Sequence, residues 1–219
     1  MTTAEGWTAA VRARLAPGRL LPLGTATDGA WITERAAREV LDRAAAAVRG
    51  VVPGALRIGP VEAEPDTEPG PRREAGVRVS ASFAVTAGRP LPELGEELRT
   101  ALLTAAEHEL GLVVAAVDLK VTELLDQAPP EEGPTAPPPG RTSPATDDPL
   151  ALAALGVAGV AGVTDALGPP VRRRPDEVRV EVAVTAGARP LDVTRAVRAA
   201  VTAAAPEGAA VTVVVSEFR

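Results

Sequence analysis

Two stretches of the chain alternate apolar and polar side chains with a period of two, as a strand with one buried face does. The first is residues 77–86 and the second is residues 178–185. Both end in Ala-Val-Thr-Ala-Gly and continue into Arg-Pro-Leu, and Ala188 is the one inserted residue in the second. Such a match at the same place after a strand indicates an internal duplication.

Each of these strands is followed by a helical pattern and then by another strand. After the first, Pro92 suits the opening turn of a helix, and apolar residues recur at helical spacing until Gly111. Residues 113–121 then predict a strand. After the second, the helical pattern ends at Pro206, and residues 210–215 predict the last strand. The repeated unit is therefore predicted to be strand, crossover helix, strand.

A further helix and a hairpin are predicted before the first repeated strand. Thr33 suits an N-cap, and an apolar stripe follows it until Gly50. The Val-Pro-Gly-Ala sequence after this helix predicts a turn. Residues 56–61 predict a short strand, paired as a hairpin with residues 77–86 across the acidic loop 62–74.

The second half of the chain carries a shortened version of this arrangement. Residues 150–157 predict a helical stub, and residues 160–163 stand where the first half has its turn. An additional helix is predicted over residues 4–15, with Trp7 on its apolar face.

A proline-rich stretch divides the chain into its predicted domains. It holds seven prolines and no apolar side chain larger than Ala or Pro, so it fits neither a sheet nor a helix. The predicted fold class is α+β in two layers, with two related small lobes, each a three-stranded sheet with a β-α-β crossover, joined by this linker. The boundaries are an N-terminal helix and extension at 1–26, a first domain at 27–127, the linker at 128–147 and a shortened second repeat at 148–219.

Charge and composition narrow the classes of partner. The 219 residues carry a formal net charge of −6, with a single lysine, Lys120, and no cysteine. Nucleic-acid binding is disfavoured because it ordinarily needs a basic surface. The absence of cysteine excludes disulfides and thiolate chemistry. No apolar run has the length of a signal peptide core or of a membrane span, so we expect a cytoplasmic protein without direct membrane insertion.

Candidate catalytic chemistry is scarce. The single histidine, His108, has no potential metal ligand three or four residues away, so it is interpreted as a solvated residue near a helix end. No serine lies in a Gly-x-Ser-x-Gly elbow, and Glu96 and Glu97 fall on an exposed helix face. We therefore predict no catalytic, cofactor-binding or metal-binding residues, no cofactor and no enzymatic activity. The serines are Ser80, Ser82, Ser143 and Ser216.

Three other features leave alternatives open. The glycine run at residues 156–162 resembles a phosphate-binding loop but has no basic residue, so the end of a short helix explains it better. The cluster Arg172-Arg173-Arg174 is interpreted as a solvated loop, with contact to an acidic partner or anionic lipid as the alternative. Arg78 and Arg179 are interpreted as standing at equivalent positions of the two repeated strands, and with carboxylates they could form a small-molecule site between the lobes.

The order of elements resembles the alkaline-shock-protein (Gls-type) family of envelope stress response proteins. The resemblance lies in the Val-Val-Pro-Gly turn at residues 51–54, the central strand and its turn at 79–91, and the valine-alternating strand at 117–121. It covers residues 29–125, and residues 178–218 resemble a truncated second copy. The family usually has one such domain, so this chain resembles a tandem with a degenerate second copy.

The resemblance implies a function without catalysis. It implies a small domain that is abundant in the cytoplasm near the membrane, is recruited by a small membrane-anchor protein and can self-associate. Together with the duplicated unit, it predicts an envelope stress response or scaffolding protein that acts through protein contacts at its strand edges. The alternative is a nucleic-acid-binding or small-ligand-binding module.

Overall fold

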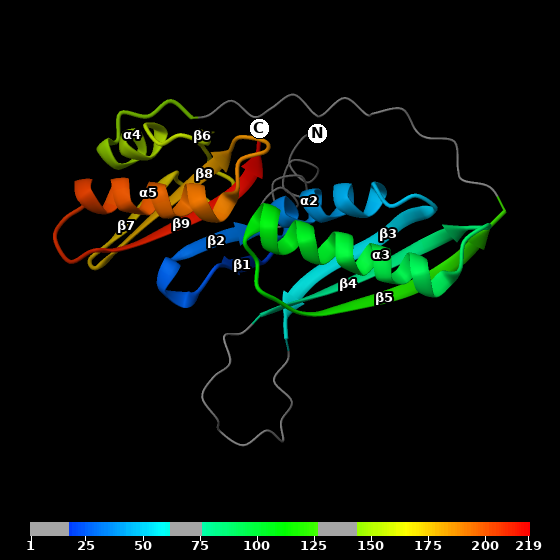
Figure 1. The fold of residues 1–219 in the computed structure, drawn as a ribbon. Coiled ribbons are helices and arrows are strands. Elements are labelled where there is room, and N and C mark those ends of the chain that lie inside the picture. Colours follow the sequence, from blue (N-terminus) through cyan, green and yellow to red (C-terminus); the bar gives the residue numbers. More distant parts are fainter. Residues whose placement is uncertain (1–17, 62–75, 127–143) are drawn as a thin grey trace, which may run out of the picture. The chain divides into compact units, whose positions relative to one another are not determined.

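The computed structural model describes residues 18–61, 76–126 and 144–219, and it shows an α+β protein (Figure 1). These residues form two compact units. We call residues 37–61 and 76–126 the central unit, and residues 18–36 and 144–219 the C-terminal unit.

The border between the units differs from the predicted domain border. It falls between Ala36 and Ala37, inside helix α2 (Glu34–Ala46). Residues 27–36 were predicted to begin the first domain, but they belong with the C-terminal residues of the chain. The physical reason is strand pairing, because residues 30–33 join the C-terminal sheet.

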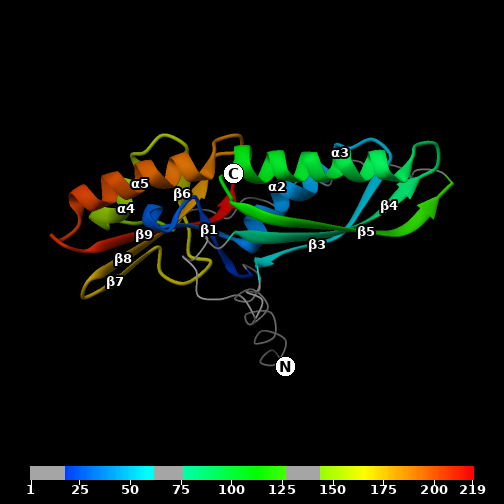
Figure 2. The ribbon, with the colours of Figure 1, turned by 60° about the horizontal axis from the view of Figure 1, so that its bottom comes forward.

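The central unit is built on a three-stranded sheet in the order β3-β4-β5. β3 is antiparallel to β4, and β4 is parallel to β5, with helix α3 as the crossover between them. In Figure 2, α3 lies along one face of this sheet. The elements after α2 are β3 (Val51–Pro60), β4 (Val77–Thr86), α3 (Leu91–Thr104), the π-helical turn η2 (Ala105–Leu110) and β5 (Val114–Leu125).

The core of the central unit follows from two periodicities. Every second residue of β4 is buried, and α3 buries Leu94, Leu98 and Leu102, which recur every four residues. Each fully buried leucine contributes about 2 kcal/mol through removal of apolar surface from water. The helix predicted up to Gly111 is present, and Gly111 ends it with a φ of 87°, which favours glycine.

The predicted turn after α2 is part of a strand. β3 runs through Pro53 and Gly54, and its register with β4 shifts between Pro53 and Leu56, which marks a bulge. Within the described ranges β3 is an edge strand, so proline is tolerated here because no amide donor is needed on its outer side. A Cβ at Gly54 would lie only 2.9 Å from the Ser82 carbonyl oxygen, so the bulge needs glycine.

The C-terminal unit has a six-stranded sheet where three strands were predicted. Its order is β1-β2-β9-β8-β6, and β7 also pairs with β8. β8 and β9 are parallel, with α5 as the crossover between them, and Figure 1 shows α5 beside the shorter α4. The elements are β1 (Leu20–Leu23), the 3-10 turn η1 (Ala26–Asp28), β2 (Ala30–Thr33), α4 (Pro149–Leu155), β6 (Val160–Val163), β7 (Val171–Arg174), β8 (Glu177–Val184), α5 (Pro190–Ala204) and β9 (Ala210–Phe218).

Four of these strands depart from the sequence interpretation. β1 lies in the segment predicted as an N-terminal extension, and β2 ends at Thr33, which was predicted only as a helix N-cap. Thr33 does cap α2 by accepting a hydrogen bond from the Ala36 amide. β7 lies in the arginine cluster, which was interpreted as a loop. β6 lies where a turn was expected. β6 and β7 together line one side of β8, as β3 alone lines β4.

Some predicted segments lie outside the described residues. They are the helix at residues 4–15 with Trp7, the loop 62–74, and residues 128–143 of the linker. Residues 144–147 are described and are neither helical nor extended in a sheet. No helix within the described ranges has both the length and the apolar run needed to span a membrane.

Candidate protein-interaction site

Strand β9 is covered on its outer edge by β2. The pairing is parallel, with Ala30, Trp31 and Ile32 beside Val213, Val214 and Val215. The Thr33 hydroxyl donates to the Ser216 carbonyl oxygen at 3.1 Å, and both side chains are buried. β1 then adds to β2 as an antiparallel strand. β1 and β2, which we call the N-terminal hairpin (residues 20–33), thus leave β9 inside its sheet and not at an edge.

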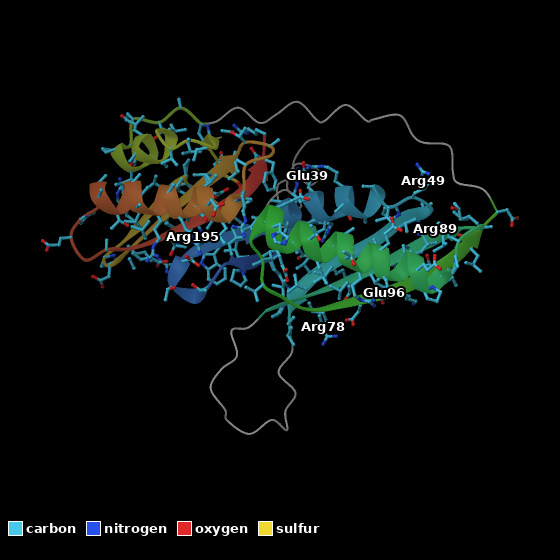
Figure 3. All side chains as sticks on the ribbon, in the orientation of Figure 1. Glu39, Arg49, Arg78, Arg89, Glu96 and Arg195 are labelled. Carbon is cyan, nitrogen blue, oxygen red and sulfur yellow. The ribbon has the colours of Figure 1, made fainter. Side chains whose placement is uncertain are left out.

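An ion pair ties the same hairpin to α5. Arg195 donates to both carboxylate oxygens of Asp28, at 2.8 and 3.1 Å, and the Thr25 amide donates to Asp28 at 2.7 Å. These bonds to the ionised form, Arg195 first, hold the pKa of Asp28 well below its usual range. Figure 3 shows Arg195 on the α5 side of this turn. The hairpin is therefore held by charge as well as by backbone pairing.

Strand β5 has no such cover. Among the described residues it pairs only with β4, so its second edge presents unpaired backbone groups over twelve residues. Its helix-facing side chains are also incompletely buried: Val121 is 40% exposed and Leu124 68%. In β9, Val213 and Val215 are fully buried. We call this unpaired side of residues 114–125 the β5 edge.

The two strands share an irregularity that lets their positions be compared. In the central unit Phe83 pairs with Val121 and Ala84 with Glu123, so Thr122 is an extra residue. In the C-terminal unit Val182 pairs with Val215 and Ala183 with Glu217, so Ser216 is the extra residue. Val-Thr-Glu of β5 thus stands where β9 has Val-Ser-Glu. Residues 119–121 of β5 correspond to the stretch of β9 that β2 covers.

A buried polar cluster lies between β8, β9 and the segment that follows β6, and it is centred on Glu181. Glu181 on β8 has no exposed surface, and it accepts hydrogen bonds from the Thr164 hydroxyl and the amides of Ala166 and Leu167 at 2.8 to 3.0 Å. Thr164 also shares a hydrogen bond with Ser216. The carboxylate therefore holds the loop between β6 and β7, and its bonding explains its burial without a catalytic role.

The arginine cluster forms a shallow basic depression. Arg172 lies directly opposite Arg179 in the β7–β8 register, and both line the depression with Arg174 and Glu177. Arg173 faces the other way and makes a bidentate ion pair with Asp148, at 2.6 and 2.7 Å, which lowers the pKa of Asp148. Like charges on facing residues repel, so this depression favours an anion.

The other residues considered from the sequence as metal, catalytic or phosphate sites have structural roles or lie without further ligating side chains in the described part of the chain. His108 is exposed in η2, and no group of three or more His, Asp or Glu side chains in the described ranges could hold a metal ion. Glu96 and Glu97 make ion pairs with Arg99 and Arg89. Gly156 ends α4, and Gly159, with a φ of 88°, precedes β6.

Arg78 and Arg179 do not occupy equivalent positions. Counting back from the shared Ala-Val-Thr, Arg78 matches Glu177, and Arg179 matches Ser80. Arg78 makes a 2.8 Å ion pair with Asp118 of β5, and Arg179 donates to the Leu167 carbonyl oxygen. Figure 3 shows Arg78 at the start of β4. The interpretation of Arg78 and Arg179 as equivalent residues of the two repeated strands was therefore wrong.

The comparisons with known proteins add no neighbour. Models of protein families, curated proteins and solved structures were all compared with the chain, and none matches.

Proposed function

We propose that this chain is a scaffolding protein without catalytic activity, which acts through protein contacts made by sheet edges. The observation that carries the proposal is the β5 edge. It is long, it has exposed apolar side chains, and the corresponding edge of β9 already accepts an added strand. Addition of a strand to an open sheet edge is a common mode of protein recognition.

We further propose that the two units arose by duplication. Three pairs of matching hydrogen bonds support this. The amides of Thr86 and Thr185 donate to Gly50 and Gly159 at 3.0 and 2.9 Å. The amides of Ala87 and Ala186 donate to Leu125 and Arg219, and those of Val51 and Val160 donate to Val48 and Val157. Each pair joins the same elements of its unit, and the shared bulge adds to the match.

The setting of the scaffold follows from the family resemblance. We propose an envelope stress response role in the cytoplasm near the membrane, with a small membrane-anchor protein as the partner. The proline-rich residues 128–147 would connect the related units as a linker.

A capture experiment with a matched control tests this function. The tagged full chain, its Leu124→Lys variant and its Leu152→Lys variant are each incubated with a membrane extract of the source cells. Both leucines are exposed, at 68% and 51%, but only Leu124 lies on β5. We expect one membrane protein to bind the parent chain and Leu152→Lys at equal levels, and its capture by Leu124→Lys to fall about tenfold. Equal capture by all three, or none by any, contradicts the proposal.

A second candidate function is the binding of a small anion in the basic depression. The facing pair Arg172 and Arg179 favours it, because a bound anion would relieve their repulsion. The test is calorimetric titration of the full chain and its Arg172→Gln variant with inorganic phosphate at low salt. Binding that the variant loses supports this function, and absence of binding to the parent chain removes it.

A further inference from the structure

The side chains of β5 divide into two sets with different chemistry. Val79, Ala81 and Phe83 of β4 are buried under the helices, and their partners on β5 are Val117, Leu119 and Val121. These three therefore lie on the helix-covered face. Asp118 and Lys120 alternate with them and lie on the open face, beside Ser80 and Ser82 of β4.

We propose that the β5 edges of two copies of this chain pair with each other, antiparallel, about a two-fold axis at Leu119. This inference rests on the proposed function, because it names one partner for the edge through which the scaffold would act. A two-fold axis makes both copies use the same surface. Two three-stranded sheets would then form one continuous sheet of six strands.

The charges of β5 select this register. With the axis at Leu119, Asp118 of each copy lies opposite Lys120 of the other, which gives two cross-strand pairs of opposite charge. Moving the axis by one residue places Asp118 opposite Asp118, or Lys120 opposite Lys120, and like charges repel. Lys120 is the only lysine of the chain, and it makes no ion pair among the described residues. Asp118 already pairs with Arg78 of β4 through Oδ2, and its other carboxylate oxygen can accept from Lys120 of the second copy.

The apolar face agrees with the same register. Val117 of each copy lies opposite Val121 of the other, and the two Leu119 side chains meet at the axis. Cross-strand pairs of this kind stabilise a sheet. Val121 is 40% exposed in the single chain, so the pairing would cover apolar surface that is now in water. The Thr122 bulge lies just beyond these residues and limits the paired length.

The corresponding edge in the C-terminal unit shows that this stretch can accept a strand. β2 covers Val213, Val214 and Val215, the residues that match positions 119–121. There the added strand is parallel and belongs to the same chain. On β5 the charges favour an antiparallel partner, because a parallel copy in register would place Asp118 beside Asp118 and Lys120 beside Lys120.

A cysteine cross-link tests the register directly. The chain has no cysteine, so Leu119→Cys introduces the only thiol. Facing residues of antiparallel strands have Cα atoms about 4.5 to 5.5 Å apart, which a disulfide can span. We expect most of the Leu119→Cys chain to become a covalent dimer under mild oxidation, and Val121→Cys, whose copies would lie four residues apart, to remain monomeric. Equal cross-linking of both, or none of Leu119→Cys, overturns the register.

Charge exchange tests the pairing without a covalent bond. Sedimentation equilibrium compares the full chain with Asp118→Lys, with Lys120→Asp and with the double variant. We expect each single variant to self-associate at least about tenfold more weakly, and the double variant to regain association. An equimolar mixture of the two single variants should associate, because all facing charges are then opposite. Circular dichroism melting of each variant shows that it is folded.

The outcomes separate this inference from the proposed function. A parent chain that is monomeric up to about 1 mM overturns the self-pairing even if the β5 edge captures a membrane protein. A register-specific dimer that captures no protein leaves the self-pairing in place and contradicts the wider scaffold function.

Discussion

The edges of β9 and β5 differ in their neighbours more than in their own sequences. Both strands are valine-rich, both follow a crossover helix, and both carry a bulge at the hydroxyl residue of Val-Thr-Glu or Val-Ser-Glu. β9 has β2 beside it and buries Val213 and Val215 completely, whereas Val121 on β5 is 40% exposed. The burial of a strand therefore depends on its neighbours in the fold, here β2 beside β9 and α5 packed against it, and a sequence pattern alone does not report those neighbours.

The largest expected effect comes from weakening the cover of β9. Ile32 is fully buried in β2, beside Val215. We expect Ile32→Ala to lower the free energy of unfolding of the C-terminal unit by about 2 to 5 kcal/mol, because it leaves a cavity in the core. Urea denaturation followed by circular dichroism measures this loss.

The matched change on the open edge should cost much less. Leu124 is 68% exposed, so Leu124→Ala is expected to change the free energy of unfolding by about 0.5 kcal/mol or less. If the two variants were equally destabilised, the contrast between a covered and an open edge would be wrong.

Glu181 and Ser82 form a second matched pair with a smaller expected difference. Each lies two residues before the shared Ala-Val-Thr, and each bonds to the preceding strand or its loop. Glu181 holds two amides and a hydroxyl in a buried site, whereas Ser82 bonds to the more exposed Ala55 backbone.

We expect Glu181→Ala to lower the free energy of unfolding by about 3 kcal/mol, because it leaves buried donors without partners. Ser82→Ala should cost about 1 kcal/mol or less, because water can replace its bonds. Thermal melting of both variants at equal concentration checks the order. A larger loss for Ser82→Ala would contradict it.

The ion pair of Asp28 and Arg195 gives a pH-dependent prediction. The pKa of Asp28 is lowered in the folded chain, so its contribution to stability is present above the unfolded-state pKa of about 3.9 and is lost as the pH falls through the folded value. We expect Asp28→Asn to be less stable than the parent by about 1 kcal/mol at pH 7.

The difference in free energy of unfolding between the parent chain and Asp28→Asn should become smaller as the pH is lowered below about 4. Denaturation of both chains at several pH values measures it. A gap that stays constant down to pH 2 would mean that Asp28 gains its stabilising contacts through size rather than charge.

The smallest effect is expected at Arg78. Its ion pair with Asp118 joins two side chains that are 46% and 53% exposed, and such pairs contribute little. Arg78→Ala should change the free energy of unfolding by less than about 0.5 kcal/mol, as measured by urea denaturation. A loss comparable to that of Asp28→Asn would contradict the expectation that the more buried carboxylate, Asp28, gains more from its ion pair than the exposed Asp118 does.

The sequence predicts the elements that repeat a period over many residues. The helices α3 and α5 and the strands β4 and β8 were predicted because each has 8 to 15 residues, long enough for regularly spaced apolar positions to indicate one buried face. β2 was missed because it has four residues and its partner β9 lies about 180 positions later in the chain. No local pattern records such a pairing.

The errors at β3 and β7 have a related cause. Proline and glycine in Val-Pro-Gly-Ala predict a turn, but an edge strand tolerates both at a bulge. Three arginines predict a solvated loop, but β7 needs only backbone pairing to β8. The sequence predicts exposed sheet edges only as a general property of small lobes. It does not identify β5, because the contrast with β9 depends on the pairing of β9 with β2.

The position of the unit border inside α2 has a consequence for synthesis of the protein. Residues 18–36 emerge from the ribosome before the central unit, yet β2 must wait for Val213 to Val215 before it can pair. The central unit has all its strands once Leu125 has been made, so it can fold while the earlier hairpin is still without its sheet. Closing a loop of this length is slow compared with local contacts. The order of synthesis therefore lets the central unit fold first, and β2 is paired late although it is made before the central unit.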